Sequence, residues 1–220
     1  MKRWETLGTA QGPDGSVLTL RHHDGDYYLA ADGYDLMTSR MHASEERLVD
    51  LGCEGLLDEA NILIGGLGMG YSLRAALDRF GPNATITVAE LLPEVVEWNR
   101  GPLGHLAGNP LDDPRTRIHL GDITQLIRHP ADGWDAILLD VDNGPDAETV
   151  QGNNWLYTRW GLSTFRDALK PGRCLAVWSV DANKDFVSRL ARSGFDATVH
   201  RVKARGEKGP RHGIYVGRRR

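Results

Sequence analysis

The chain has 220 residues, of which 40% are hydrophobic and 25% charged, and its formal net charge is −4 at pH 7. This composition is typical of a globular chain with one sizeable core, and the negative balance argues against a general nucleic-acid binder. There is no apolar run of about eighteen residues and no apolar signal segment at the N-terminus. We therefore expect a cytoplasmic protein that does not enter a membrane.

Residues 1–40 predict a small β-hairpin unit. Residues 16–21 alternate loosely between apolar and polar side chains, and an Asp-Gly turn follows within residues 23–26. A second strand-like run at 27–30 ends at another Asp-Gly turn, which begins at Asp32. We expect this unit to be separate from a nucleotide-binding domain formed by residues 41–220.

The segment after the hairpin unit predicts a helix. Ser39 or Ser44 is suitably placed to cap its start, and Gly52 is expected to end it. The nearby Cys53 and the distant Cys174 lack the paired spacing of metal ligands, so both are expected to be reduced packing residues. The basic stretches at 201–211 and 218–220 are expected to be solvated surface.

From residue 60 onward, strand-like and helix-like segments alternate, which predicts a mainly parallel sheet covered on both faces. The expected strands are 62–64, 85–90, 117–120, 136–140, 173–178, 197–202 and 213–216, and the expected helices lie near 72–80, 93–99, 123–128, 161–169 and 183–193. The last two strands are close enough in sequence to form an antiparallel hairpin. These seven strands suit an α/β fold of the methyltransferase-like Rossmann type.

A glycine-rich loop joins the first of these strands to the following helix. It reads Gly66-x-Gly68-x-Gly70, whereas the dinucleotide fingerprint Gly-x-Gly-x-x-Gly would require a glycine where the chain has Tyr71. The next strand ends at Glu90, whose carboxylate can accept hydrogen bonds from both hydroxyls of a ribose. We therefore expect an adenosine-type ligand; the alternative is a loop that only turns the chain.

Further acids follow the next two strands, and the carboxyl ends of parallel strands meet at one edge of a sheet. Asp122 can accept a hydrogen bond from an adenine amino group, or it can cap the helix that follows. Asp140 and Asp142 are the candidate catalytic residues, because a carboxylate can steady a sulfonium and orient or deprotonate an attacking amine. The alternative is that these aspartates only stabilise a turn.

Most of the chain resembles the spermidine synthase family, the polyamine aminopropyltransferases. The matching segments are Ile64-Gly-Gly-Leu-Gly-Met-Gly70, Val88-Ala-Glu-Leu91, Gly121-Asp122, Trp134-Asp-Ala-Ile-Leu-Leu-Asp140, Gly144-Pro145 and residues 156–172, together with the N-terminal hairpin and Met41-His42-Ala-Ser-Glu45. The resemblance implies polyamine biosynthesis, with S-adenosylmethionine or its decarboxylated form as co-substrate and no metal. It also implies that Glu90 binds the ribose, Asp122 lies near adenine, His42 lies in the donor site and Asp140 is the catalytic acid.

Four positions depart from the family pattern, one of which is Asp142, the second acid of the catalytic loop, which lies one residue closer than in the family. Gly68 stands where the family has an aspartate that faces the aminopropyl amine, Met41 replaces a tyrosine, and Leu36 replaces a glutamine. On the acceptor side, Trp155, Tyr157 and Trp160 can either stack on a substrate or pack the following helix. The scattered histidines at 22, 23, 105, 129, 200 and 212 indicate no ligand cluster.

Three classes of function are open. The first is a transferase that moves an aminopropyl or methyl group from an adenosyl-sulfonium donor to a small acceptor. An amine acceptor is favoured, because Asp140, Asp142 and Asp146 would make the cavity negative. The second class, an oxidoreductase on a dinucleotide, is disfavoured by the missing third glycine. The third is a non-enzymatic nucleotide-binding or oligomerising protein that retains the scaffold. The sequence is compatible with a homodimer but does not decide the oligomeric state.

Overall fold

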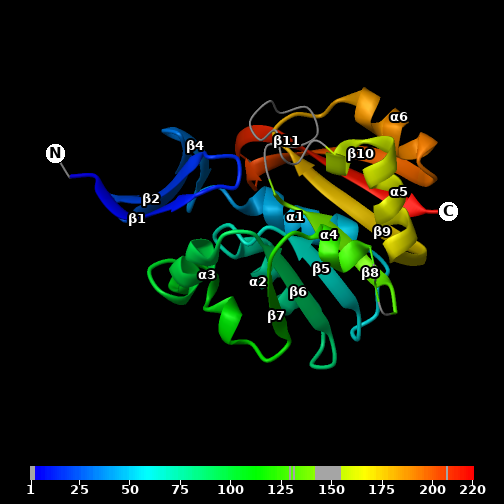
Figure 1. Ribbon diagram of the computed structural model, residues 1–220, viewed down its shortest axis with the longest axis horizontal. Coiled ribbons are helices and arrows are strands. Elements are labelled where there is room, and N and C mark those ends of the chain that lie inside the picture. Colours follow the sequence, from blue (N-terminus) through cyan, green and yellow to red (C-terminus); the bar gives the residue numbers. More distant parts are fainter. Residues whose placement is uncertain (1–2, 129, 131, 142–154, 207) are drawn as a thin grey trace.

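The computed structural model describes residues 3–128, 130, 132–141, 155–206 and 208–220. Two β-sheets lie side by side in Figure 1, a small N-terminal sheet on the left and a larger sheet with its helices on the right. The smaller sheet has four antiparallel strands, and the larger has seven strands, most of them parallel. The expected α/β fold class, with its seven-stranded sheet and N-terminal hairpin unit, is confirmed.

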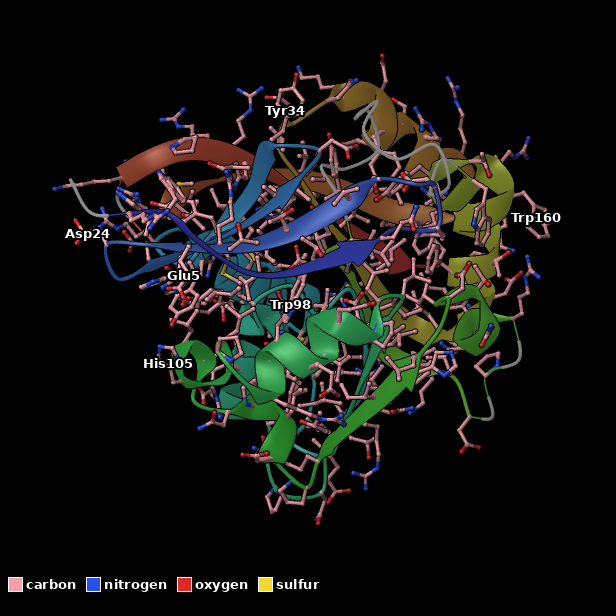
Figure 2. All side chains as sticks on the ribbon, turned by 60° about the vertical axis from the view of Figure 1, so that its left-hand side comes forward. Glu5, Asp24, Tyr34, Trp98, His105 and Trp160 are labelled. Atoms are coloured by element: carbon pink, nitrogen blue, oxygen red, sulfur yellow. The ribbon has the colours of Figure 1, made fainter. Side chains whose placement is uncertain are left out.

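The N-terminal sheet is larger than the expected hairpin. The two expected strands correspond to β2 (Val17–His23) and β3 (Asp26–Ala31), and the sheet is extended on its two sides by β1 (Glu5–Gln11) and β4 (Tyr34–Thr38). Both Asp-Gly turns have positive φ angles at both central residues, which matches the right-handed twist of the flanking strands. β1 crosses α3 closely at Gly8, where a Cβ would lie 2.5 Å from Nε1 of Trp98; Figure 2 labels this tryptophan.

The larger sheet has the strand order β10-β11-β9-β8-β5-β6-β7. The five strands from β9 to β7 are parallel, and β11 is antiparallel to both of its neighbours, so the expected C-terminal hairpin is confirmed. The strands are β5 (Asn61–Gly65), β6 (Thr85–Glu90), β7 (Thr116–Leu120), β8 (Trp134–Leu139), β9 (Leu169–Ser179), β10 (Phe195–Arg205) and β11 (Lys208–Arg219). The chain order reverses between β5 and β8, which is where open α/β sheets bind ligands.

Helices cover both faces of this sheet. Leucines and valines of α1, α2 and α3 share one core cluster with Ile62, Ile64 and Leu138, whereas α4, α5 and α6 pack on the face of Leu63 and Ile137. The helices are α1 (Ala43–Gly52), α2 (Tyr71–Arg79), α3 (Pro93–Arg100), α4 (Thr124–Ile127), α5 (Arg159–Ala168) and α6 (Lys184–Arg192), with two short 3-10 turns, η1 (Gly104–Ala107) and η2 (Pro110–Asp112).

The prediction that Ser39 or Ser44 caps the start of α1 is wrong. His42 is the N-cap residue, and its side chain makes no capping hydrogen bond. The Ser39 hydroxyl instead accepts a hydrogen bond from the Tyr27 amide, and the Ser44 hydroxyl donates to Glu45. Glu46 lies in the first turn, where a negative side chain interacts favourably with the helix dipole.

The remaining expectations concern cysteines, basic residues and membranes. Cys53 and Cys174 are free and buried, as expected, and burial raises the pKa of Cys53 to about 12. In the basic C-terminal hairpin, the side chains of Arg201, Arg205 and Arg211 are exposed. Within the described part of the chain, no helix is long and apolar enough to cross a membrane.

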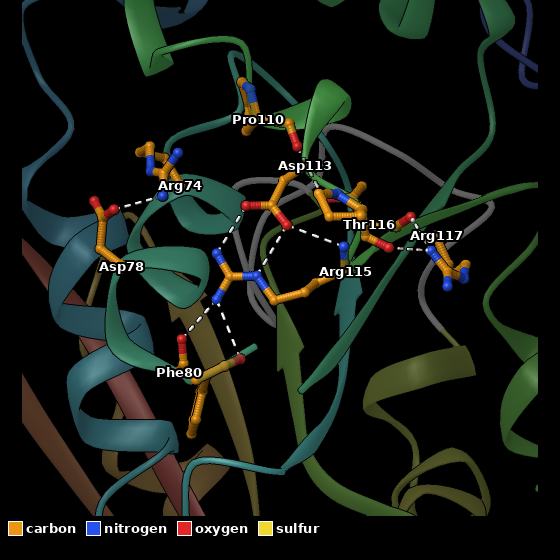
Figure 3. A network of polar contacts seen from close by, with 10 residues as sticks. Arg74, Asp78, Phe80, Pro110, Asp113, Arg115, Thr116 and Arg117 are labelled. Carbon is orange, nitrogen blue, oxygen red and sulfur yellow. Dashed lines mark hydrogen bonds and ion pairs between the residues drawn. The ribbon is translucent and has the colours of Figure 1, made fainter. Parts of the chain in front are cut away.

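Hydrogen bonds of the Arg115 side chain connect the start of β7 to the end of α2, as Figure 3 shows. Its Nε and Nη2 donate to the two carboxylate oxygens of Asp113 at 2.9 and 2.7 Å, and its Nη1 donates to the Phe80 carbonyl at 2.6 Å. The hydrogen bond from the Arg115 side chain lowers the pKa of Asp113 to about 2. This pair therefore stabilises the fold while Asp113 is ionised.

Replacing Asp113 by asparagine should lower the free energy of unfolding by about 1 kcal/mol at pH 7, because a charge-assisted pair near the surface is lost. The folded-state pKa is depressed, so this stabilisation is present above the ordinary carboxyl pKa of 3.8 and is lost as pH falls toward about 2. Urea unfolding of both chains from pH 7 down to pH 3 measures the difference. Asp50→Asn, which removes the exposed partner of Arg47, is the control. If Asp113→Asn lowered the free energy of unfolding by the same amount at every pH, the stabilising role of the Asp113–Arg115 pair would be contradicted.

Candidate functional site

The carboxyl ends of β5, β6, β7 and β8 meet at one edge of the larger sheet, where the chain order reverses. A cavity of about 90 Å³ lies at this edge. Its walls include Gly66, Glu90, Gly121, Asp122, Ile123 and Leu156. Three of the residues expected to bind the donor, Gly66, Glu90 and Asp122, therefore lie around one cavity, although they come from three different strand ends.

The glycine loop depends on glycine at each of its three positions. Gly66, Gly68 and Gly70 have φ angles of 87°, 51° and 83°, a region that side chains with a Cβ rarely adopt. A Cβ at Gly66 would lie 2.3 Å from the Asp140 carbonyl oxygen, so the loop presses against the end of β8. The glycines are thus required by the backbone itself, and the close contact brings the loop next to Asp140.

Glu90 holds this loop in place. Its Oε2 accepts a hydrogen bond from the Leu67 amide at 2.9 Å, and its Oε1 accepts one from the Leu92 amide at 3.0 Å. Burial raises the pKa of Glu90, and the hydrogen bonds from these two amides oppose that rise. A carboxylate has about four acceptor positions, so Glu90 can hold the loop and still accept hydrogen bonds from a ribose.

Asp122 holds the start of α4 by a hydrogen bond, although the N-cap position itself is Ile123. Oδ1 of Asp122 accepts a hydrogen bond from the Thr124 amide at 2.8 Å, at the start of α4. The preceding Gly121 donates its amide hydrogen to the Glu90 carbonyl at 2.8 Å. The ends of β6 and β7 are therefore joined, and the second carboxylate oxygen of Asp122 is left for another donor such as an adenine amino group.

Asp140 follows β8 directly and is fixed by a neighbouring helix. The Ser72 hydroxyl, in the first turn of α2, donates to its Oδ2 at 2.7 Å. The candidate catalytic residue Asp142 and the acceptor-side Asp146 lie outside the described residues.

His42 lies over the start of α2. Its ring stacks on Tyr71 with 4.3 Å between the ring centroids, and its Nδ1 lies 2.7 Å from Oε1 of Glu46. Tyr71 immediately follows Gly70, so His42 is brought close to the glycine loop. The neighbouring Gly68 faces β4, because a Cβ there would lie 3.3 Å from the sulfur of Met37.

Glu45, a buried residue that the sequence did not assign to the site, interacts with Asp140. Glu45 is only 4% exposed, and its Oε2 accepts a hydrogen bond from Ser44 at 2.6 Å. Burial and then the negative charge of Asp140 raise the pKa of Glu45 to about 8. The Ser44 hydroxyl also lies 3.0 Å from Nδ1 of His212, a residue of β11. Only the position of Glu45 inside the family-like segment could have drawn attention to it.

The aromatic residues that follow the candidate catalytic segment differ in their surroundings: one lies in the core, and the other two lie together beside an arginine. Tyr157 is buried and packs edge-on against Phe186, so it belongs to the core. The ring centroids of Trp155 and Trp160 lie 5.6 Å apart, and the Arg128 guanidinium lies over both rings. Trp160 is exposed and projects away from the molecule in Figure 2. A cation of the chain itself therefore already lies against these two indole rings.

Among the described residues, no group of three or more His, Cys, Asp and Glu side chains is arranged to hold a metal ion. The chemistry that the site can support is carried by its carboxylates and backbone amides. The site contains the Glu90 carboxylate, which can accept hydrogen bonds from a ribose, and the Asp122 carboxylate. Asp140 lies at the end of β8, the neighbour of β5.

Gly66→Ala should destabilise the fold more than Gly15→Ala. Both glycines have a φ of 87°, but a Cβ at Gly15 would meet nothing within 4 Å. Gly15→Ala should therefore cost only the backbone strain of about 1–2 kcal/mol, and Gly66→Ala about 1–3 kcal/mol more, because a backbone carbonyl must move. Chemical denaturation of both variants measures the difference, and equal losses would show that the loop does not press on β8.

No family model matches the chain. Among curated proteins it is similar to the polyamine aminopropyltransferase of Korarchaeum cryptofilum, with 27% identity over 150 residues that cover 67% of this chain and 44% of the relative. The spermine synthase of Arabidopsis thaliana is 28% identical over 67% of this chain and 40% of the relative. The polyamine aminopropyltransferase of Corynebacterium efficiens is 35% identical over a segment that covers 61% of this chain and 25% of the relative. The chain thus spans less than half the length of these relatives.

Solved structures agree on the fold. A spermidine synthase in complex with the transition state analogue AdoDATO superposes with a TM-score of 0.72 and 20% identity, covering 96% of this chain and 72% of the other. The spermidine synthase from Thermotoga maritima gives a TM-score of 0.73 with the same identity and coverage. At this identity the likeness concerns the fold, and the curated relatives supply the likeness in sequence.

Proposed function

We propose that this protein transfers an aminopropyl group from decarboxylated S-adenosylmethionine to an amine. The proposal is supported by the resemblance of the chain to the spermidine synthase family in both sequence and fold. The observation that carries this proposal is the convergence of Glu90, Asp122 and Asp140 at one edge of the sheet, two of them around a cavity. Residues 41–220 would form the nucleotide-binding domain and residues 1–40 a separate unit beside it.

In this proposal, the nucleoside of the donor lies at the ends of β5, β6 and β7. Glu90 accepts hydrogen bonds from the ribose while it holds the Leu67 amide, and Asp122 accepts one from adenine while it holds the start of α4. Gly66 lets the donor approach the backbone without meeting a side chain. The donor's sulfonium then faces the end of β8, where Asp140 is anchored by Ser72.

The transfer requires a neutral amine nitrogen. Its lone pair attacks the carbon next to the sulfonium, the new N–C bond forms as the C–S bond breaks, and methylthioadenosine leaves with the electron pair on sulfur. Asp140 orients the incoming ammonium and takes its proton before the attack. Asp142 is kept as a proposed second carboxylate for the same step.

The donor's amino end must be held differently from the family pattern. Gly68 provides no carboxylate, and the adjacent space is taken by the thioether of Met37. The polar groups beside this position include Asn99, whose Nδ2 donates to the Gly68 carbonyl at 2.8 Å, and the stacked rings of His42 and Tyr71. An intact S-adenosylmethionine carries a carboxylate at this end, so comparison of the two donors tests how this chain discriminates between them.

Glu90→Ala should weaken the binding of methylthioadenosine by about 1.5–3 kcal/mol, the scale of hydrogen bonds to a charged group. Calorimetry measures the change, and Glu97→Ala, which removes an exposed partner of Arg100, is the control. Thermal unfolding of Glu90→Ala must be recorded alongside, because the same carboxylate holds the loop. Tighter binding of NAD than of any sulfonium nucleoside or thioether would contradict the assignment.

Asp140→Asn should keep the fold and donor binding but lower transfer by roughly 10²–10⁴-fold, because an amide can neither carry the charge nor take the proton. Ser72→Ala should lower transfer by about tenfold, since Asp140 loses one hydrogen bond. Asp78→Asn, an exposed change on the same helix, should have no effect. Mass spectrometry follows methylthioadenosine and S-adenosylhomocysteine with both donors and a panel of amines.

Unchanged turnover in Asp140→Asn would mean that this residue only shapes the turn. A wild-type chain that binds donor but transfers nothing to any amine would favour the alternative of a non-enzymatic nucleotide-binding protein. Formation of S-adenosylhomocysteine instead of methylthioadenosine would replace aminopropyl transfer by methyl transfer.

A further inference from the structure

We propose that Glu45 is a positioning residue for the amine acceptor: its carboxyl group holds a proton when no amine is bound and gives it up, through Ser44 to His212, when an ammonium binds beside Asp140. This inference rests on the proposed function, because it takes a cationic amine as the acceptor. It adds a carboxylate from α1 and a proton exit on β11 to a site built otherwise on the ends of β5 to β8.

The first observation is the isolation of the Glu45 carboxyl group. Its side chain is 4% exposed, in the first turn of α1, and its side-chain partner is the Ser44 hydroxyl at 2.6 Å. In the described ranges of the chain, no Lys, Arg or His nitrogen comes within 4.0 Å of this carboxylate. A buried carboxylate without a cation is costly, so the group is expected to bind a proton or a cationic ligand.

The second observation is the character of the groups that face Glu45. They are Asp140 at the end of β8, Glu46 on the same helix and Tyr71 on α2. His212 on β11 lies on the other side of Ser44. Burial and the charge of Asp140 raise the pKa of Glu45 to about 8, and burial raises that of Tyr71 to about 12. Burial also lowers the pKa of His212, which Asp181 opposes. At pH 7 the only charges in this set are negative.

The third observation is a continuous path for the proton. Ser44 lies between Glu45 and His212, with its Oγ 2.6 Å from Oε2 of Glu45 and 3.0 Å from Nδ1 of His212. The ring of His212 packs edge-on against Trp178 and is half-buried. One end of the path is therefore beside the negative groups of the site, and the other end reaches a partly exposed ring.

The proton balance is simple. With Glu45 protonated, the Ser44 hydroxyl turns to donate to Nδ1 of His212 instead of to Glu45. Glu45 then passes its proton to the Ser44 oxygen, the Ser44 proton passes to Nδ1 of His212, and His212 releases its Nε2 proton to solvent. His212 ends neutral in the other tautomer, Glu45 ends as a carboxylate, and one proton leaves per ammonium bound. The ammonium drives the exchange, because a nearby positive charge favours the ionised form of a carboxyl group. The new carboxylate supplies negative charge in a chain whose glycine loop has Gly68 in place of an acid.

Calorimetry with 1,4-diaminobutane, in the presence of methylthioadenosine, tests the proposal. At pH 7, titrations in phosphate and in Tris should show release of about one proton per amine bound, from the difference in buffer ionisation heat. The affinity of the wild-type chain should rise about tenfold from pH 7 to pH 9, as linkage to one group that titrates near 8 requires. This pH profile needs no variant, so it remains informative if a substitution disturbs folding.

Glu45→Gln should bind the diamine more weakly, release no proton and show a flat pH profile, whereas Glu54→Gln, an exposed change beyond the end of α1, should behave as the wild type. Ser44→Ala and His212→Phe should slow proton release in a stopped-flow experiment with a pH indicator. A wild-type chain that binds the diamine in an Asp140-dependent way but releases no proton would overturn this inference and leave the proposed function intact. A wild-type chain that binds no amine would overturn both.

Discussion

The hydrogen bonds from the Leu67 and Leu92 amides to the buried Glu90 carboxylate connect the parts of the molecule that the site requires. They join the end of β6 to the loop that follows β5. The Gly66 amide donates to the Ala89 carbonyl, and the same glycine lies against the Asp140 carbonyl at the end of β8. Three strand ends are thus fixed relative to one another by backbone groups, before any ligand is considered. In the proposed function, a donor whose ribose lies on Glu90 directs its reactive end toward Asp140.

Local signals predicted most of the larger sheet. The run 62–64, the three glycines and the acid at Glu90 lie within thirty residues of one another, and each is specified by its immediate neighbours. β1 and β4 were not predicted, because β1 is polar and contains Gly8, and β4 is half exposed. The contact of Gly8 with Trp98 of α3 explains why a glycine is tolerated in that strand. Tertiary contact, and not propensity, decides such positions.

The parts of the site that sequence reasoning missed are contacts between distant segments. Ser44 and His212 are 168 residues apart, and no periodicity or spacing relates them. Met37 reaches Gly68 from the N-terminal sheet, and Ser72 reaches Asp140 from the helix after the loop. The proposed acceptor side therefore draws on α1, α2 and β11, with β4 beside the donor's amino end, whereas the proposed nucleoside site is formed by consecutive strand ends. Consecutive strand ends carry a local signal in the sequence, whereas a contact between distant segments, such as that of Ser44 with His212, carries none.

The central claim is that the nucleoside binds at the ends of β5, β6 and β7, with its ribose on Glu90. A crystal structure of the protein with methylthioadenosine tests this claim most directly. The account predicts ribose hydroxyls within hydrogen-bonding distance of the Glu90 carboxylate, adenine beside Asp122, and the thioether sulfur directed toward Asp140. Methylthioadenosine bound elsewhere, for example in the groove between α1 and the strands β10 and β11, with Glu90 still bonded only to Leu67 and Leu92, would contradict it.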